Sequence, residues 1–182
     1  MVAPAAGLAD RWAEEPIAPP TAPGNIYSQT TSDHLSPATR DALPRVYVPN
    51  HSSNTVSVID TDKWAVTNTI KVGQRPRGIE FTRDGKFVLV AVGDDDKIEV
   101  IDAATQQVVD SLPSGPDPEL FTQDAAGKTL YVANENDNTV TIIDLEKRVR
   151  VGDVQVGVEP VGRALSPDST HLITTAETTT IH

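Results

Sequence analysis

The sequence predicts an all-β fold built from small antiparallel sheets that repeat along the chain. Within residues 131–144, YVANENDNTVTIID, apolar residues alternate on either side of a polar turn, which is the pattern of a β-hairpin. This hairpin ends at Asp144, and two similar segments end at Asp102 and Asp60, so each step is 42 residues (144 − 102 and 102 − 60). Hairpins that recur at one fixed spacing indicate a repeat protein.

The same spacing holds for several chemical types of residue from Arg45 onward. A spacing shared by apolar, amide, glycine and proline positions is hard to obtain by chance. The equivalent positions are Tyr47, Leu89, Tyr131 and Ile173; Asn54, Asp96 and Asn138; Val56, Ile98 and Val140; Gly73, Gly115 and Gly157; and Pro76, Pro118 and Pro160.

Each repeat is expected to form four short strands joined by tight turns. In the second repeat these strands are residues 76–81, 87–92, 98–101 and 107–112. An Asp-Gly pair in the first turn permits a tight hairpin, and Asp102 can bond its own backbone two residues on to begin the next reversal. Because the apolar period is two throughout, the repeats are predicted to be antiparallel meanders without helices.

Sheets of this size must stack on copies of themselves, because each leaves apolar residues on both faces. Repeats of about 40 to 50 residues with four strands each are typical of β-propeller blades. The repeats cover residues 45–182, which is 138 residues or about three and a third blades (138/42), whereas closed propellers have about 4 to 8. The predicted blades form an open arc and are residues 45–74 (partial), 75–116, 117–158 and 159–182 (incomplete).

The open arc leads to two further expectations. His182 falls at the position of Val56 and Val140, inside a hairpin, so the chain stops in the middle of a blade. We therefore expect the front part of a longer propeller, in preference to a ring closed by several copies of the chain. The apolar faces at the two ends of the arc should be exposed, and the isolated chain should associate through them.

Residues 1–44 differ in composition from the repeats. They are rich in Ala and Pro and show neither helical nor strand periodicity, so we expect a largely irregular arm in which residues 25–30 are a short strand candidate. Trp12 in this arm and Trp64 in the first repeat are expected to be packing residues.

Composition narrows the classes of partner. The net charge of −11 disfavours binding to nucleic acid and to anionic membrane surfaces, and the 4% aromatic content disfavours a base-stacking groove. No run approaches the roughly 18 apolar residues of a membrane span, and no secretory signal is visible, so no membrane insertion is expected. The chain has no cysteine, which excludes disulfides and thiol chemistry.

The repeat motif resembles a known family. Residues 47–60, YVPNHSSNTVSVID, residues 131–144, and the pattern VGxxPxG at residues 72–78 and 156–162 are similar to the YVTN-repeat β-propeller family. The second repeat departs from the motif, with LVAV at residues 89–92. The resemblance implies a seven-bladed propeller of the kind common in exported proteins (periplasmic, secreted or on the cell surface), most often without a known enzymatic activity.

The candidate site is the rim of the central channel. In a propeller the first strand of each blade lines the channel and the loop before it forms one rim, so residues beside the repeated proline should cluster although they lie 42 apart. We expect this polar ring to bind a ligand or a partner, and the competing interpretation is that it consists of ordinary solvated ion pairs. The candidate residues are Arg75, Arg77, Asp117, Glu119, Glu159 and Arg163.

The sequence predicts no catalytic residue, no metal and no cofactor. The acidic turns at residues 93–97 and 134–138 lack a metal-loop spacing. There is neither a nucleophile elbow nor a phosphate-binding loop. The histidines do not pair at a ligand spacing, and they are His34, His51, His171 and His182.

These observations favour a non-enzymatic propeller module that presents its rim loops to a protein or a surface polymer. The alternative is a fragment of a propeller enzyme or its accessory subunit, of the lactonase-like or quinoprotein type, with its chemistry at the channel mouth. Under that alternative the groups that contact the substrate would be Arg77, Glu119, Glu159 and Arg163, and further blades would supply the rest.

Overall fold

The computed structural model describes residues 43–166 and 168–177. In this part of the chain there are thirteen β-strands, one short 3-10 turn and no α-helix, in agreement with the all-β prediction. The predicted arm, with its strand candidate and Trp12, lies outside the described residues except for its last two positions. No helix in the described ranges has the length and apolar character needed to cross a membrane.

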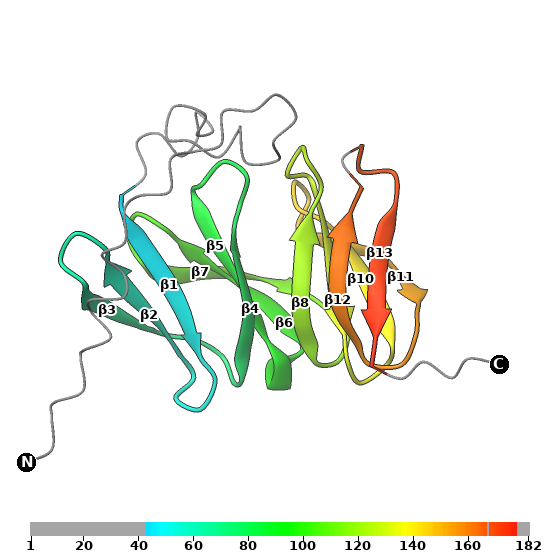
Figure 1. Cartoon of the computed structure of the whole chain (residues 1–182), viewed down its shortest axis with the longest axis horizontal. Coiled ribbons are helices and arrows are strands. Elements are labelled where there is room, and N and C mark those ends of the chain that lie inside the picture. Colours follow the sequence, from blue (N-terminus) through cyan, green and yellow to red (C-terminus); the bar gives the residue numbers. More distant parts are fainter. Residues whose placement is uncertain (1–42, 167, 178–182) are drawn as a thin grey trace, which may run out of the picture. The chain divides into compact units, whose positions relative to one another are not determined.

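The strands form four antiparallel sheets in chain order (Figure 1). Each sheet is a meander in which neighbours in sequence are hydrogen-bonded neighbours in space. The first contains β1 (Arg45–Asn50), β2 (Thr55–Asp60) and β3 (Ala65–Lys71). The second contains β4 (Pro76–Phe81), β5 (Phe87–Val92), β6 (Lys97–Asp102) and β7 (Gln107–Pro113). The third contains β8 (Pro118–Gln123), β9 (Thr129–Asn134), β10 (Thr139–Asp144) and β11 (Val149–Gln155), and the fourth β12 (Pro160–Leu165) and β13 (Leu172–Ala176).

The four sheets of the described residues stack as an open series and do not close into a ring. The inner strands lie beside one another, β4 against β8 and β8 against β12, while β1 contacts β4. The outer strands β3, β7 and β11 contact one another in the same order. This arrangement is that of propeller blades, and the first, second, third and fourth sheets are called blades 1 to 4 below.

Two apolar clusters hold the blades together, as expected if no sheet can bury both of its own faces. The cluster between blades 1 and 2 contains Tyr47, Val56, Val58, Ile70, Val72, Val88, Val90, Val92 and Ile101. The cluster between blades 2 and 3 contains Leu89, Ala91, Ile98, Val100, Leu112, Phe121, Leu130, Val132 and Ile143. Burial of this apolar area contributes about 25 cal/mol per Å² and is the main source of stability in such a stack.

The 42-residue spacing reflects recurring backbone geometry. Asn54, Asp96 and Asn138 all adopt a left-handed backbone, with φ of 56°, 52° and 57°. Asn and Asp accept this conformation more readily than other residues with a Cβ, which explains why only they occupy the position. Their side-chain oxygens accept hydrogen bonds from the backbone N–H groups of the residues 21 positions later, at 3.0, 2.9 and 2.9 Å, and those donors are Arg75, Asp117 and Glu159.

The aspartates that end each hairpin close the next turn, as predicted. The Asp102 carboxylate accepts hydrogen bonds from the N–H groups of Ala104 at 3.0 Å and Thr105 at 2.7 Å. Asp60 and Asp144 accept the equivalent bond from the N–H of the residue three positions later. The pairing of the last two strands shifts register at one equivalent place in each of blades 1 to 3, between Val58 and Ile59, Val100 and Ile101, and Ile142 and Ile143.

One local expectation needs correction, and one predicted turn is confirmed with its geometry. Trp64 is not a packing residue, because it lies in the turn before β3 with 83% of its surface exposed and a left-handed backbone (φ 48°). The turn expected at residues 93–96 is a single 3-10 turn, Gly93–Asp95, closed by the left-handed Asp96. In both places the left-handed residue turns the chain sharply, and at Trp64 this directs the side chain away from the sheet.

Candidate functional site

Three of the residues that the sequence assigned to the rim lie in the loops before β4, β8 and β12, and the other three, Arg77, Glu119 and Arg163, lie on those strands. Arg75, Asp117 and Glu159 stand at the same position of these loops and have left-handed backbones, with φ of 57°, 56° and 52°. Each is held by the Asn or Asp side chain of the preceding hairpin turn described above. The loop backbone is therefore fixed by residues common to all repeats, while its side chains differ from blade to blade.

Arg75 joins blades 2 and 3. Its guanidinium forms an ion pair with Asp117, whose carboxylate is buried, and its Nε lies 2.9 Å from Oδ1 of the exposed Asp94. Gly93 makes this contact possible, because a Cβ at that position would lie 2.6 Å from Asp117 Oδ1 and 2.9 Å from Arg75 Nε. A guanidinium with one buried and one exposed carboxylate partner is held in a defined orientation.

Arg77 forms a second connection between the same blades. It makes an ion pair with the buried Glu119 on β8, and its Nη1 lies 3.6 Å from Oε2 of Glu135 in the β9–β10 turn. The candidate residues 42 positions apart thus do meet, as Arg75 with Asp117 and Arg77 with Glu119. These four residues form one group at the junction of blades 2 and 3.

Glu159 and Arg163 are placed differently. No ion pair of either with that group is found in the described part of the chain. Glu159 takes the position of Arg75 and Asp117, and its carbonyl oxygen accepts a hydrogen bond from the N–H of Glu177 at 3.3 Å. Arg163 lies further along β12 and donates from Nε to the carbonyl of Phe121 at 2.6 Å.

Arg163 donates a hydrogen bond to a backbone carbonyl of β8 and forms no ion pair with the group formed by Arg75, Arg77, Asp117 and Glu119. Burial lowers the pKa of the half-buried Arg163, against the opposing effect of the Glu80 charge. Burial also raises the pKa of the Glu80 carboxyl, and nearby Arg83 and Arg163 reduce that rise. Gln123 donates in the same way from Nε2 to the carbonyl of Phe81 at 2.8 Å, so β4 and β8 each have a backbone carbonyl that bonds to a side chain of the next blade.

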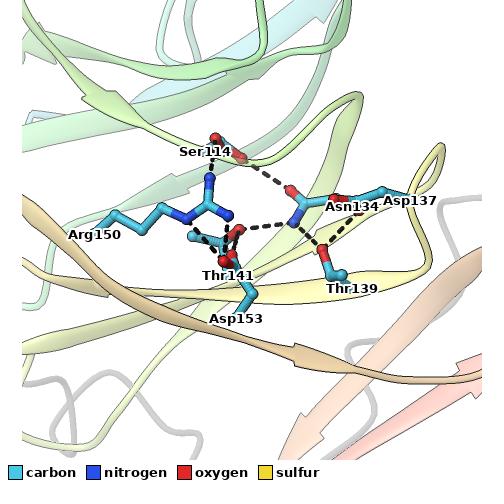
Figure 2. A network of polar contacts seen from close by, with 7 residues as sticks. All are labelled: Ser114, Asn134, Asp137, Thr139, Thr141, Arg150 and Asp153. Carbon is cyan, nitrogen blue, oxygen red and sulfur yellow. Dashed lines mark hydrogen bonds and ion pairs between the residues drawn. The ribbon is translucent and has the colours of Figure 1, made fainter.

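A network of polar side chains positions the loop before β8 (Figure 2). The fully buried Asn134 accepts a hydrogen bond from Ser114 Oγ at 2.9 Å, and donates to Thr139 Oγ1 at 2.9 Å and Thr141 Oγ1 at 2.8 Å. Gly115 follows Ser114, and a Cβ there would lie 2.5 Å from Asn134 Nδ2. The loop and the end of β9 are therefore packed so closely that residue 115 has no space for a side chain.

The network continues to the outer strand β11. Thr141 donates to Asp153 Oδ1 at 2.8 Å, Asp153 pairs with Arg150, and Arg150 Nη1 donates to the Ser114 carbonyl at 3.3 Å. Burial raises the pKa of Asp153, but the hydrogen bonds from Arg150 and Thr141 outweigh it and the net shift is downward. Since the side-chain amide of Asn134 bonds only to blade 3 and to the loop before β8, we interpret this network as support for that loop.

The acidic turns and the two histidines that the structure describes show no metal arrangement. Asp95 accepts from the N–H of Gln74 at 3.3 Å and lies 3.6 Å from Lys97 Nζ, so its carboxylate is engaged within the protein. Residues 43–166 and 168–177 contain no group of three or more His, Cys, Asp or Glu side chains arranged to hold a metal ion. His51 and His171 are exposed, and His34 and His182 lie outside the described residues.

Sequence reasoning missed three residues that contact or support this group: Asp94, Glu135 and Asn134. They could have been predicted from the pairing of the first and second strands of each blade. Pro118 stands opposite Asn134, and the N–H of Glu135 donates to the carbonyl of Asp117 at 3.0 Å. The residue after the second strand of a blade must therefore lie beside the loop before its first strand.

Comparisons with known proteins support the fold. No family model matches the chain, and no curated protein matches it. Among solved structures 928 chains match, so the fold is widespread and does not by itself identify a function. One of them, hydrazine synthase of Kuenenia stuttgartiensis, has 25% sequence identity and a TM-score of 0.70 over 76% of this chain. The match spans 40% of the hydrazine synthase chain, and it agrees with a propeller-like arrangement of the sheets.

Proposed function

We propose that this protein is a non-enzymatic β-propeller module that presents its rim loops to a protein or a surface polymer. The observation that carries the proposal is the contrast between a constant loop backbone and varied loop side chains. The backbone of each loop is held by the same left-handed pair of residues, whereas the side chains at one position are Arg75, Asp117 and Glu159. Recognition sites are commonly built this way, with variable loops on a rigid scaffold.

The charge of the rim suggests a cationic partner. Four carboxylates pair with or lie near the guanidinium groups of Arg75 and Arg77, and they belong to Asp94, Asp117, Glu119 and Glu135. Glu159 adds a fifth carboxylate at the equivalent loop position of blade 4. The chain as a whole also carries −11. Complementary charge accelerates encounter and excludes partners of like charge. We infer that a basic protein segment, or a polymer that carries amino groups, is the partner class.

The proposal includes the YVTN-repeat family as the origin of the motif. The residues that carry this resemblance are also those that hold the loops, so they are compatible with a full propeller of seven blades. Within that proposal residues 1–44 form an arm and residues 45–182 the repeats, with blade limits at residues 45–74, 75–116, 117–158 and 159–182.

Rim variants would test the proposal. The immobilised protein is exposed to basic polypeptides, amino-polysaccharides and cell extract, and the species retained by wild type are compared with those retained by Glu135→Lys and Arg77→Glu. Asp62→Lys, in the β2–β3 turn, changes the charge by the same amount as Glu135→Lys and is the control for that variant. Rim variants should lose or exchange bound species while the control retains them. If charge reversal at Arg77 and Glu135 leaves every bound species unaffected, the rim is not the binding surface.

A second candidate function is a part of a propeller enzyme or its accessory subunit. The observation that favours it is the similarity to a solved structure named for an enzyme, hydrazine synthase. Under this alternative Arg77, Glu119, Glu159 and Arg163 would face the substrate. Replacing the buried Glu119 with Gln would then abolish turnover while leaving the binding of basic partners largely intact, whereas a binding module would show no turnover to lose.

Self-association through the ends of the blade series is part of the same proposal. Val46 on β1 has 46% of its surface exposed, while its equivalents Val88 and Leu130 are fully buried by the preceding blade. Ile173 on β13 is 61% exposed, while its equivalent Leu89 is 1% exposed beneath the following blade. These two faces should fit each other, because the equivalent positions pack together between blades 1 and 2 and between blades 2 and 3.

A further inference from the structure

A cavity of about 280 Å³ lies between blades 2 and 3, and it is separate from the rim residues. Its apolar wall includes Leu89, Val100 and Leu112, which are buried, and the half-buried Phe87 and Leu145. Its polar lining consists of Thr82, Arg83, Asp84, Lys128, Glu146 and Arg148. The cavity therefore combines an apolar interior with charged groups at its border.

The departure of the second repeat from the motif accounts for this cavity. At the equivalent place between blades 1 and 2, Tyr47 stands where blade 2 has Leu89. The Tyr47 ring packs edge-on against Phe81, with centroids 5.4 Å apart, and its hydroxyl lies 3.4 Å from the carbonyl oxygen of Ala103. Leu89 lacks the distal part of that ring and the hydroxyl, and Gln123 and Leu145 stand where Phe81 and Ala103 do, so the packing around the phenol is not repeated in the next interface.

The lining of the two cavities agrees with this explanation. The cavity beside Tyr47 measures about 200 Å³, and Val58 and Ile70 do not line it. Their equivalents Val100 and Leu112 do line the larger cavity. With Leu in place of Tyr, the cavity extends to the buried side chains of Val100 and Leu112.

The charge at the border of the cavity favours an anion. Arg83, Lys128 and Arg148 face two carboxylates, Asp84 and Glu146, which gives the lining a net charge of +1 in a chain of −11. Lys128 pairs with Glu146 at 3.1 Å, and Arg148 forms an ion pair with Asp110.

Arg83 is the cation best placed for an anionic ligand. It donates to the neutral carbonyls of Gln123 at 3.1 Å and Asp124 at 3.3 Å, and its nearest carboxylate oxygen, from Glu80, is 3.9 Å away. Gly127 lies against it, since a Cβ there would be 2.8 Å from Arg83 Cβ. The guanidinium thus bridges two blades, and its two hydrogen bonds go to neutral carbonyls, not to carboxylates.

We propose that this cavity binds a small organic anion with an apolar body, in the class of aryl or branched alkyl carboxylates. The apolar body would contact Leu89, Val100 and Leu112, and the carboxylate would pair with Arg83. The volume lies just below the range of about 300 to 1,000 Å³ found for drug-sized ligands, so the ligand is a small one. The site does not depend on the proposed rim function.

Titration with 4-phenylbutyrate, followed by the methyl NMR signals of the protein, tests the proposal. We expect saturable shifts at Leu112, Leu145 and Val100, and binding of 4-phenylbutanol at least fivefold weaker. Leu89→Tyr places the repeat's own residue in the cavity and should weaken phenylbutyrate binding at least tenfold. Arg83→Gln should weaken phenylbutyrate several-fold and leave phenylbutanol unchanged.

Matched controls separate this site from other surfaces. Arg45→Gln, which alters the interface between blades 1 and 2, and Glu135→Lys at the rim should leave the titration unchanged. If Leu89→Tyr does not fold, Leu112→Phe fills the cavity from the opposite wall and should have the same effect. Unchanged binding in the folded filling variant, equal affinity for the alcohol, or shifts confined to Val46 and Ile173 would each overturn the proposal.

Discussion

At the scale of single residues, the left-handed Asn and Asp positions connect the repeat pattern to the rim. Asn54 holds a φ of 56° and accepts a hydrogen bond from the N–H of Arg75 at 3.0 Å. A residue with a Cβ but no local side-chain bond pays about 1 to 2 kcal/mol to adopt this backbone. A net hydrogen bond adds about 1 kcal/mol. Asn or Asp therefore recurs every 42 residues because this position requires both a left-handed backbone and a side-chain hydrogen-bond acceptor.

Asn54→Ala and Asn54→Gly separate these two contributions. The alanine variant loses the hydrogen bond and strains the backbone, so it should lower the free energy of unfolding by about 2 to 3 kcal/mol. The glycine variant keeps the left-handed backbone and should lose only about 1 to 2 kcal/mol. Urea unfolding followed by circular dichroism measures both. Equal losses in the two variants would show that backbone strain plays no part.

The turn aspartates predict how stability depends on pH. The pKa of Asp102 is lowered by hydrogen bonds from the Thr105 N–H, the Thr105 hydroxyl and the Ala104 N–H. The pKa of Asp168 is lowered to about 2, first by the Ser166 hydroxyl and then by Thr170. A carboxyl whose pKa is depressed on folding stabilises the protein above its unfolded pKa, near 3.8, and loses that contribution as the pH falls through the folded pKa.

Thermal unfolding between pH 5 and pH 2 checks this expectation. Wild type should become progressively less stable below about pH 4. Asp102→Asn keeps an oxygen acceptor but cannot titrate, so its midpoint temperature should fall less steeply over the same range. A variant curve parallel to that of wild type would mean that Asp102 does not contribute to the acid transition.

At the scale of the elements, ion pairs connect β4 with β8 above the apolar contact between blades 2 and 3. Arg77 pairs with the buried Glu119 and lies near Glu135, whereas Val161 occupies the Arg77 position of blade 4. An apolar residue is therefore accommodated at this position of the fold. The buried carboxylate of Glu119, in contrast, would destabilise the fold if its cation were removed.

A double-mutant cycle tests this coupling. Arg77→Met should lower the free energy of unfolding by about 1 to 3 kcal/mol, a range reduced from that of fully buried pairs because Arg77 is partly exposed. Glu119→Gln in the same background should restore part of the loss, because it removes the unpaired charge. Chemical denaturation of the four proteins gives the interaction energy. Strict additivity would show that the two side chains act independently.

Strand positions could be predicted from the sequence because they depend on local chemistry. The period of two, the Asp-Gly turn and the hairpin aspartates each act within a few residues, and β4 and β5 were predicted with their observed bounds. The rim partners Asp94 and Glu135 were missed because they depend on register between strands. Trp64 was placed wrongly because hydrophobic character alone does not indicate whether a turn directs a side chain inward. Leu89 was recognised as a departure from the motif. The cavity beside it could not be predicted, because it becomes apparent only when the packing of Leu89 is compared with that of the Tyr47 ring in the first repeat.

At the scale of the whole described unit, every interface between blades joins the same two kinds of face. One face carries the positions of Tyr47 and Leu89, and the next blade presents the positions of Val88 and Leu130 against it. The first kind of face is uncovered at Ile173, and the second kind is uncovered at Val46. Such a pair of faces joins head to tail, and a contact of this type grows into rings or open chains rather than stopping at a symmetric dimer.

Single-charge variants test the head-to-tail contact by sedimentation velocity. Wild type should associate with rising concentration, whereas Val46→Lys and Ile173→Lys alone should each remain monomeric, because every contact would bury one lysine. An equimolar mixture of the two variants can form one contact between two unaltered faces, so it should form dimers and nothing larger. A mixture that stays monomeric would show that the uncovered faces do not meet. Association of either variant alone would place the contact elsewhere, and a wild type that stays monomeric at all concentrations would remove the case for self-association.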